Sequence, residues 1–134
     1  FSYGNKEDKE AFLLYVQAEK YLHEFKFIEV VEMLSFIREN YPNSSIIPIA
    51  MLRECLLRII IDETSISLSI AKLLQQTSLA PEGITTQGEI YEKTYKDTEK
   101  AIEMYNLLLE EYPMSMLAEP VRMRIRKLNN VEKS

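Results

Sequence analysis

The stretch that decides the fold runs from residue 88 to residue 113 and reads GEIYEKTYKDTEKAIEMYNLLLEEYP. In its second half, Ala101, Tyr105 and Leu108 recur at intervals of three and four residues, which is the spacing of one face of an α-helix. In its first half, Gly88 is a small residue that lets one helix approach the next closely. The stretch therefore predicts two antiparallel helices that pack against each other.

The same pattern recurs upstream with a period of about 35 residues. Small residues that correspond to Gly88 fall at Ala18 and Cys55, which are 37 residues apart, and Gly88 follows 33 residues later. Serine, a favoured N-cap, stands between successive helix pairs at Ser44, Ser78 and Ser115. A proline near the start of the following helix comes next in each case, at Pro48, Pro81 and Pro120.

The chain is predicted to be all-α, because no convincing segment alternates with period two. Seven helices are expected, over residues 7–25, 27–40, 45–61, 65–76, 81–95, 98–112 and 115–129. They make three antiparallel pairs, at residues 8–42, 45–76 and 81–113, followed by a capping helix at 115–129. We expect an α-solenoid in a single domain over residues 1–134.

The composition agrees with a helical fold. The 134 residues contain three glycines and five prolines, which is about half of the usual combined share of roughly 12%. Sandwiches and barrels need a turn about every ten residues, so this scarcity excludes them. One cysteine excludes an internal disulfide framework. A net charge of −5 without a basic block argues against a nucleic-acid partner.

The longest apolar run, over residues 46–61, falls short of the roughly 20 residues that a membrane-spanning helix needs. We therefore expect no membrane span. The first ten residues are polar and acidic, unlike a signal peptide. Because the first residue is phenylalanine, we expect the chain to be the C-terminal part of a larger or processed protein.

These motifs resemble the tetratricopeptide repeat. The resemblance covers residues 8 to 128 and is most specific at residues 88–91, 99–105 and 112–113. One residue is inserted near Lys96, and Arg126 replaces the small residue in the last helix, which suits a terminal cap. The resemblance implies a scaffold for protein–protein interaction. The long first helices are similar to those of bacterial envelope members, which implies the envelope or periplasm rather than the cytoplasm.

The sequence contains no convergent set of catalytic groups. His23 has no local nucleophile and no second histidine for a metal. Cys55 falls on a helix contact and is predicted to be a buried structural thiol. The acidic pairs at residues 62–63 and 110–111 are predicted to be solvated, as is the basic cluster of the last helix at Arg122, Arg124, Arg126 and Lys127. We therefore predict no enzymatic activity, no cofactor and no metal.

The family resemblance implies that the first helix of each pair lines a concave groove. The groove positions are Phe12, Tyr15, Glu19, Leu22, Ile49, Leu52, Leu56, Ile59, Glu82, Thr85, Glu89 and Glu92. They change from aromatic through aliphatic to acidic, which favours an apolar or basic segment of a protein or peptide as the partner. The alternative is that stacking of the helix pairs consumes this apolar surface.

Two further functions stay open. A homodimer could form through the N-terminal flank, where Phe1, Tyr3, Phe12 and Phe25 are expected beside an uncovered helix pair. The chain could also be an accessory domain of an enzyme whose catalytic part lies upstream.

Overall fold

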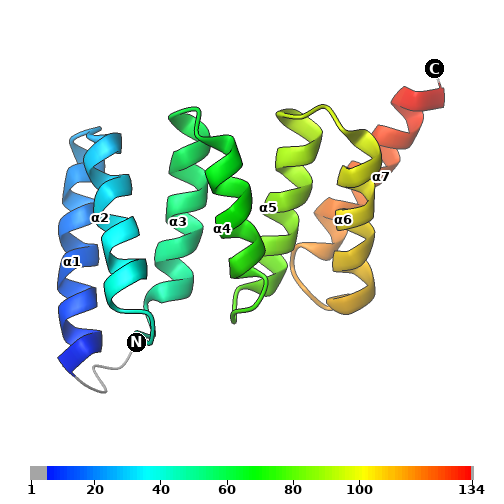
Figure 1. Cartoon of the computed structure of the whole chain (residues 1–134). Helices are drawn as coiled ribbons and strands as arrows, with labels where there is room; N and C mark the ends of the chain where they lie inside the picture. The colour runs from blue at the N-terminus through cyan, green and yellow to red at the C-terminus, as the bar shows by residue number, and fades with distance from the viewer. Residues whose placement is uncertain (1–5, 134) are drawn as a thin grey trace. The chain divides into compact units, whose positions relative to one another are not determined.

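The computed structural model of the chain describes residues 6–133. Within this range there are seven α-helices and no strand (Figure 1): α1 (Lys6–His23), α2 (Phe27–Asn40), α3 (Ile47–Ile60), α4 (Thr64–Leu74), α5 (Ala80–Lys93), α6 (Thr98–Glu111) and α7 (Ala118–Lys133). The predicted all-α class is confirmed for these residues. Phe1 and Tyr3, which the sequence assigns to the N-terminal flank, lie outside the described range.

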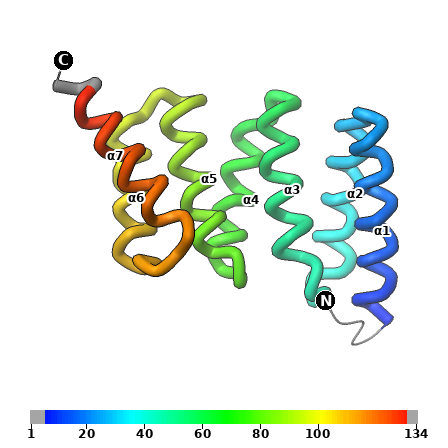
Figure 2. Tube along the Cα trace, turned by 180° about the vertical axis from the view of Figure 1, so that it is seen from behind, coloured from blue at the N-terminus to red at the C-terminus, as the bar shows by residue number. Residues whose placement is uncertain are grey.

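The sequence predicts a single domain, and backbone contacts group the chain into two compact units, residues 1–70 and 71–134, with the boundary inside α4. In unit 1, α2 packs against both α1 and α3. In unit 2, α6 packs against both α5 and α7. Figures 1 and 2 show α1 antiparallel to α2, and α5 antiparallel to α6, as the sequence predicts. None of the helices within residues 6–133 has the length and apolarity that a membrane span requires.

The predicted small residues are buried at close contacts between helices. Ala18 is 1% exposed and Cys55 is fully buried. Cys55 of α3 lies against α4, since the Ser67 hydroxyl donates a hydrogen bond of 2.7 Å to the Cys55 carbonyl oxygen. A Cβ atom on Gly88 of α5 would overlap the ring of Tyr105 in α6. The close approach predicted from the small residues is therefore confirmed at Cys55 and Gly88.

Gly83, for which the sequence offers no explanation, allows a second close approach. A Cβ atom at this position would lie 2.8 Å from the backbone nitrogen of Gln75 and 3.0 Å from the carbonyl oxygen of Ala71. The start of α5 therefore packs directly on the backbone at the end of α4.

The serine N-caps are predicted at the wrong place. Each helix begins later than a cap at the predicted serine would imply. It follows a turn in which the side-chain oxygen of one Ser or Thr accepts a hydrogen bond from the amide two residues further along the chain. These bonds are 3.2 Å from Ile46 to Ser44, 3.1 Å from Leu79 to Thr77 and 3.1 Å from Leu117 to Ser115. The carbonyl oxygen of the same residue accepts from the amide three residues on, which is the first residue of the helix. Thr77 takes this part in place of the predicted Ser78, which is exposed.

The turns inside the helix pairs each contain one residue with left-handed backbone geometry, namely Phe25 (φ 59°), Asp62 (φ 65°) and Lys96 (φ 54°). In the first two turns, an amide donates to a carbonyl five residues earlier, at 3.1 Å from Lys26 to Tyr21 and at 2.7 Å from Glu63 to Arg58. In the third, Asp97 donates to Tyr91, six residues earlier, at 2.8 Å. The third turn thus holds the predicted extra residue near Lys96.

The start of α1 is bonded to the turn between α2 and α3. Asp8 Oδ1 accepts the amide of Ser45 at 2.7 Å, and Glu7 Oε1 accepts the amide of Asn43 at 3.2 Å. The bond from the Ser45 amide holds the pKa of Asp8 below its ordinary value of 3.8. Because the folded-state pKa is lowered, this carboxylate stabilises the fold at pH values above about 4, and the contribution disappears as the pH falls through the folded pKa.

Replacing Gly88 with alanine should lower the free energy of unfolding by about 1 to 3 kcal/mol, because overpacking a filled core has this cost. Helix propensity alone would make the alanine variant more stable by about 1 kcal/mol. The sign of the measured change in the free energy of unfolding therefore distinguishes a close contact at residue 88 from an ordinary helix position. Urea unfolding followed by circular dichroism measures it. In the double variant Gly88→Ala/Tyr105→Leu, the loss should be smaller than the sum of the single losses. A stabilised Gly88→Ala protein would contradict the close contact.

Candidate partner-binding site

Residues of α1 and α3 surround an open hollow of about 230 Å³ in unit 1. Four predicted groove residues line it: Tyr15 from α1, and Ile49, Leu52 and Leu56 from α3. The three α3 residues are spaced three and four apart, so the helix places them on one side. Ile49 is 48% exposed and Leu56 is 45% exposed, so packing leaves a large part of this apolar surface open.

The rim of the hollow holds a polar cluster that the sequence does not predict. Arg53 also lines the hollow, and its Nη2 atom lies 3.1 Å from Oε1 of Glu19, a predicted groove residue. The Tyr15 hydroxyl lies close enough to the same arginine for the two groups to influence each other's pKa. Burial raises the pKa of Tyr15, so the hydroxyl group is protonated at neutral pH. Because Arg53 and Glu19 balance each other, the hollow combines an apolar wall with a rim of no net charge.

The other predicted groove residues of unit 1 lie outside this hollow. Phe12, Leu22 and Ile59 are each half-buried, and none of them lines it. The structure thus brings together Tyr15, Ile49, Leu52 and Leu56, and it leaves the other three outside the hollow.

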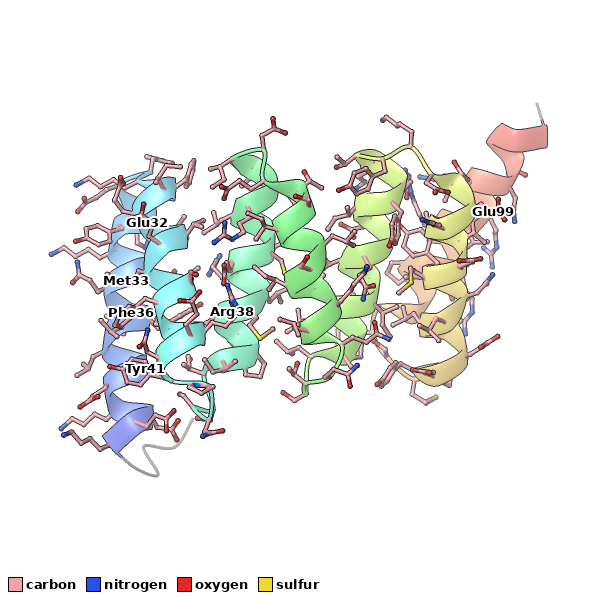
Figure 3. The ribbon with its side chains drawn as sticks, in the orientation of Figure 1. Glu32, Met33, Phe36, Arg38, Tyr41 and Glu99 are labelled. Atoms are coloured by element: carbon pink, nitrogen blue, oxygen red, sulfur yellow. The ribbon has the colours of Figure 1, made fainter. Side chains whose placement is uncertain are left out.

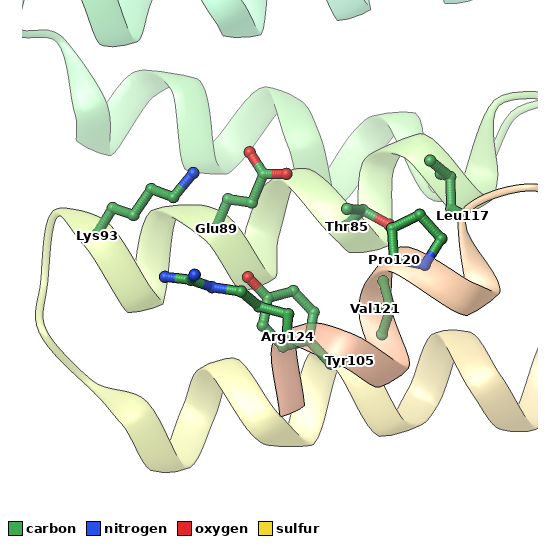
Figure 4. Close-up of a pocket in the computed structure, with 8 residues that line it drawn as sticks. All are labelled: Thr85, Glu89, Lys93, Tyr105, Leu117, Pro120, Val121 and Arg124. Carbon is green, nitrogen blue, oxygen red and sulfur yellow. The ribbon is translucent and has the colours of Figure 1, made fainter. Parts of the chain in front are cut away.

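Unit 2 has a hollow of its own between α5 and α7, with a volume of about 220 Å³ (Figure 4). Its lining residues are Thr85, Glu89, Lys93, Tyr105, Leu117, Pro120, Val121 and Arg124. Glu89 is exposed here. The Thr85 hydroxyl oxygen is buried without a hydrogen-bond partner among the described residues. Burial, with a smaller contribution from the Glu89 carboxylate, raises the pKa of Tyr105.

Glu92 differs from the expected open groove residue. It is 8% exposed, and its carboxylate accepts hydrogen bonds of 2.8 Å from the Tyr105 hydroxyl and 2.8 Å from Nε of Arg124. Arg124 Nη2 also bonds to the second carboxylate oxygen of Glu92. The prediction that Arg124 is a solvated residue of the cap is therefore wrong, because it neutralises a carboxylate 32 residues earlier in the chain.

Unit 1 contains a buried ion-pair network that the sequence analysis misses. Glu54 of α3 is fully buried, and its Oε1 and Oε2 atoms lie 3.0 and 3.2 Å from the guanidinium nitrogens of Arg38 in α2. Arg58 Nε donates to the same carboxylate at 2.8 Å, and Arg58 Nη1 donates to Glu63 at 2.6 Å. The Glu54 carboxylate raises the pKa of Arg38. Glu63 keeps 40% of its side chain exposed and is in addition paired with Arg58.

A signal for half of this network is present in the sequence. Glu54 and Arg58 are four residues apart in an apolar helix, a spacing that favours an ion pair. The partner Arg38 lies 16 residues before Glu54, so only the packing of α2 on α3 reveals it. Buried carboxylates need such partners, since an isolated buried charge is strongly unfavourable.

The residues that could carry chemistry are placed apart from one another. The Cys55 thiol is buried, and burial raises its pKa to about 12, so the prediction of a buried structural thiol is confirmed. His23 is exposed at the end of α1. Among the side chains that the structure describes, residues 6–130, no three of His, Cys, Asp or Glu are grouped so that they could hold a metal ion.

No family model matches this chain, and no curated protein is significantly similar to it.

Removing the buried carboxylate with Glu54→Ala should cost about 3 to 5 kcal/mol, because two arginines lose their counter-ion inside the fold. The matched control is Glu119→Ala, which breaks an exposed pair with Arg122 at 3.0 Å and should cost less than about 1 kcal/mol. Urea unfolding of both variants measures the two losses. Similar losses in the two variants would show that the Glu54 network carries no special share of the stability.

Proposed function

We propose that this chain is a non-catalytic interaction module that binds an apolar segment of another protein along its first helices. The observation that carries the proposal is the open hollow between α1 and α3, in which Ile49, Leu52 and Leu56 present apolar surface to solvent. Exposed apolar surface in a concave site is typical of protein-binding regions. The resemblance to the tetratricopeptide repeat also implies a groove position for Tyr15 and these three residues, and family membership is part of the proposal.

The lining defines the chemistry of the bound segment. A volume of about 230 Å³ has room for one or two side chains, and the α3 wall is aliphatic. An aliphatic or aromatic side chain of the partner would cover Ile49 and Leu56, which removes apolar surface from water. The polar rim of Tyr15, Glu19 and Arg53 is available to the backbone or polar groups beside that side chain.

The proposal also extends to unit 2, whose hollow favours a different kind of partner side chain. Glu89 is exposed in the hollow between α5 and α7, and the buried Thr85 hydroxyl group lacks a partner among the described residues. Both groups accept hydrogen bonds, so a segment with an uncharged donor side chain fits this hollow, to which Lys93 and Arg124 already contribute two cations. The aliphatic part of such a side chain would lie against Pro120 and Val121.

Selection of binders from a random peptide library on the intact chain tests the proposal. Leu56→Lys places a charge in the apolar wall and should weaken the selected peptides at least about tenfold, since buried anchor residues dominate binding. The matched control is Ile60→Lys, which introduces the same charge on α3 at a residue that is 62% exposed and outside the hollow. Fluorescence anisotropy gives the affinities. Two results would overturn the proposal: a library without binders, or equal binding to the Leu56→Lys variant and the wild-type chain.

A further inference from the structure

One side of α2 combines acidic and apolar residues that no described segment covers. Glu29, Glu32, Met33 and Phe36 follow the spacing of three and four residues that defines one helix face, here called the acidic face. Figure 3 shows Glu32, Met33 and Phe36 on the side of α2 away from α3, whereas Arg38 points toward α3. With Leu14 and Tyr21 of α1, the four residues line a hollow of about 340 Å³.

The acidic face is open and its carboxylates have no ion-pair partner, although Lys26 lies near enough to Glu29 to interact with its charge. Phe36 is 49% exposed, and Glu29 and Glu32 are also exposed. Neither glutamate forms an ion pair with any side chain in the described part of the chain. Lys26, at the start of α2, is paired with Glu24 at 3.0 Å instead. The face therefore suits a partner surface that has both a cation and an apolar side chain.

The same chain carries a surface of that kind on α7. Met123, Arg126 and Lys127 are spaced three and four residues apart and share one side of the helix, here called the basic face. Met123 is 51% exposed, and both cations are exposed without an acidic partner among the described side chains. The other two arginines of α7 are already paired, Arg122 with Glu119 and Arg124 with Glu92.

We propose that the chain associates head to tail, with the basic face of α7 in one copy docked on the acidic face of α2 in another. Met123 would enter the apolar part of the hollow beside Met33 and Phe36, and thioether side chains adapt well to such irregular sites. Arg126 and Lys127 would pair with Glu29 and Glu32. A second copy is the occupant that the charges favour, because the complementary surface belongs to the same chain.

This contact joins two different surfaces, so it does not close on itself in a pair. Repeated head-to-tail contacts produce rings or open chains of subunits, whereas a contact between two identical faces produces a closed dimer. The proposal is independent of peptide binding, since neither face includes a residue of the hollow between α1 and α3.

Analytical ultracentrifugation of the intact chain and its charge-reversal variants provides the test. The mass of the wild-type chain should rise with concentration past that of a dimer. Raising the NaCl concentration from about 0.05 to about 0.5 M, which shortens the Debye length roughly threefold, should weaken the association. Glu32→Lys removes the acidic face and Lys127→Glu removes the basic face, so each variant alone should be monomeric.

An equimolar mixture of the two variants is the decisive sample. The intact basic face of the Glu32→Lys chain fits the intact acidic face of the Lys127→Glu chain, and the two reversed faces also fit each other, so the mixture should associate although each variant alone is monomeric. The double variant Glu32→Lys/Lys127→Glu should associate again, which also shows that the substituted chains fold. The matched control is Glu103→Lys, at the corresponding exposed position on α6, and it should associate like the wild type.

Three results would overturn the proposal. If the wild-type chain stays monomeric up to its solubility limit, the acidic face does not bind a second copy and belongs to a different partner. A Lys127→Glu chain that still dimerises would indicate a contact between two acidic faces or two N-terminal flanks. If the Glu103→Lys variant no longer associates, the docking site lies on α6 and not on the acidic face of α2.

Discussion

The structure depends on the absence of side-chain bulk at one position of α3 and one position of α5. Where Gly88 faces Tyr105, the tyrosine ring fills the space that a Cβ atom would need, so α5 and α6 can pack closely. Cys55 and Ser67 fulfil the same requirement between α3 and α4 with a thiol and a hydroxyl group that both bond to backbone. Since these contacts fix the helix pairs, they also determine which faces of the first helices stay open.

Buried carboxylates provide the second constraint. Glu54 in unit 1 and Glu92 in unit 2 both lie on first helices, and each is neutralised by arginine from another helix. Buried ion pairs contribute little net stability compared with apolar packing, yet they tolerate few alternative arrangements because each charge needs its partner. The two networks therefore specify which helix packs beside which, while the apolar residues supply most of the favourable free energy.

The sequence predicts the helices well and the contacts between them only in part. Periods of three and four residues locate all seven helices within residues 6–133, with ends that differ by at most four residues. The N-caps are misplaced because a Ser or Thr that starts a turn looks the same in sequence as one that starts a helix. Arg124 and Glu92 are 32 residues apart, and no local pattern connects them. Only the tertiary packing could show that Glu92 is buried and that Leu56 is open.

An interaction module of this kind needs a surface that stays apolar and open after the helices have packed, and the hollow between α1 and α3 meets that requirement. Methyl NMR of the intact, isotope-labelled chain, titrated with a peptide selected on it, tests this use of the hollow most directly. The methyl signals of Ile49, Leu52 and Leu56 are predicted to shift on binding, and those of Ile60 are predicted to stay unchanged. Shifts confined to residues outside the hollow, such as Ile28 or Ile66, would contradict it.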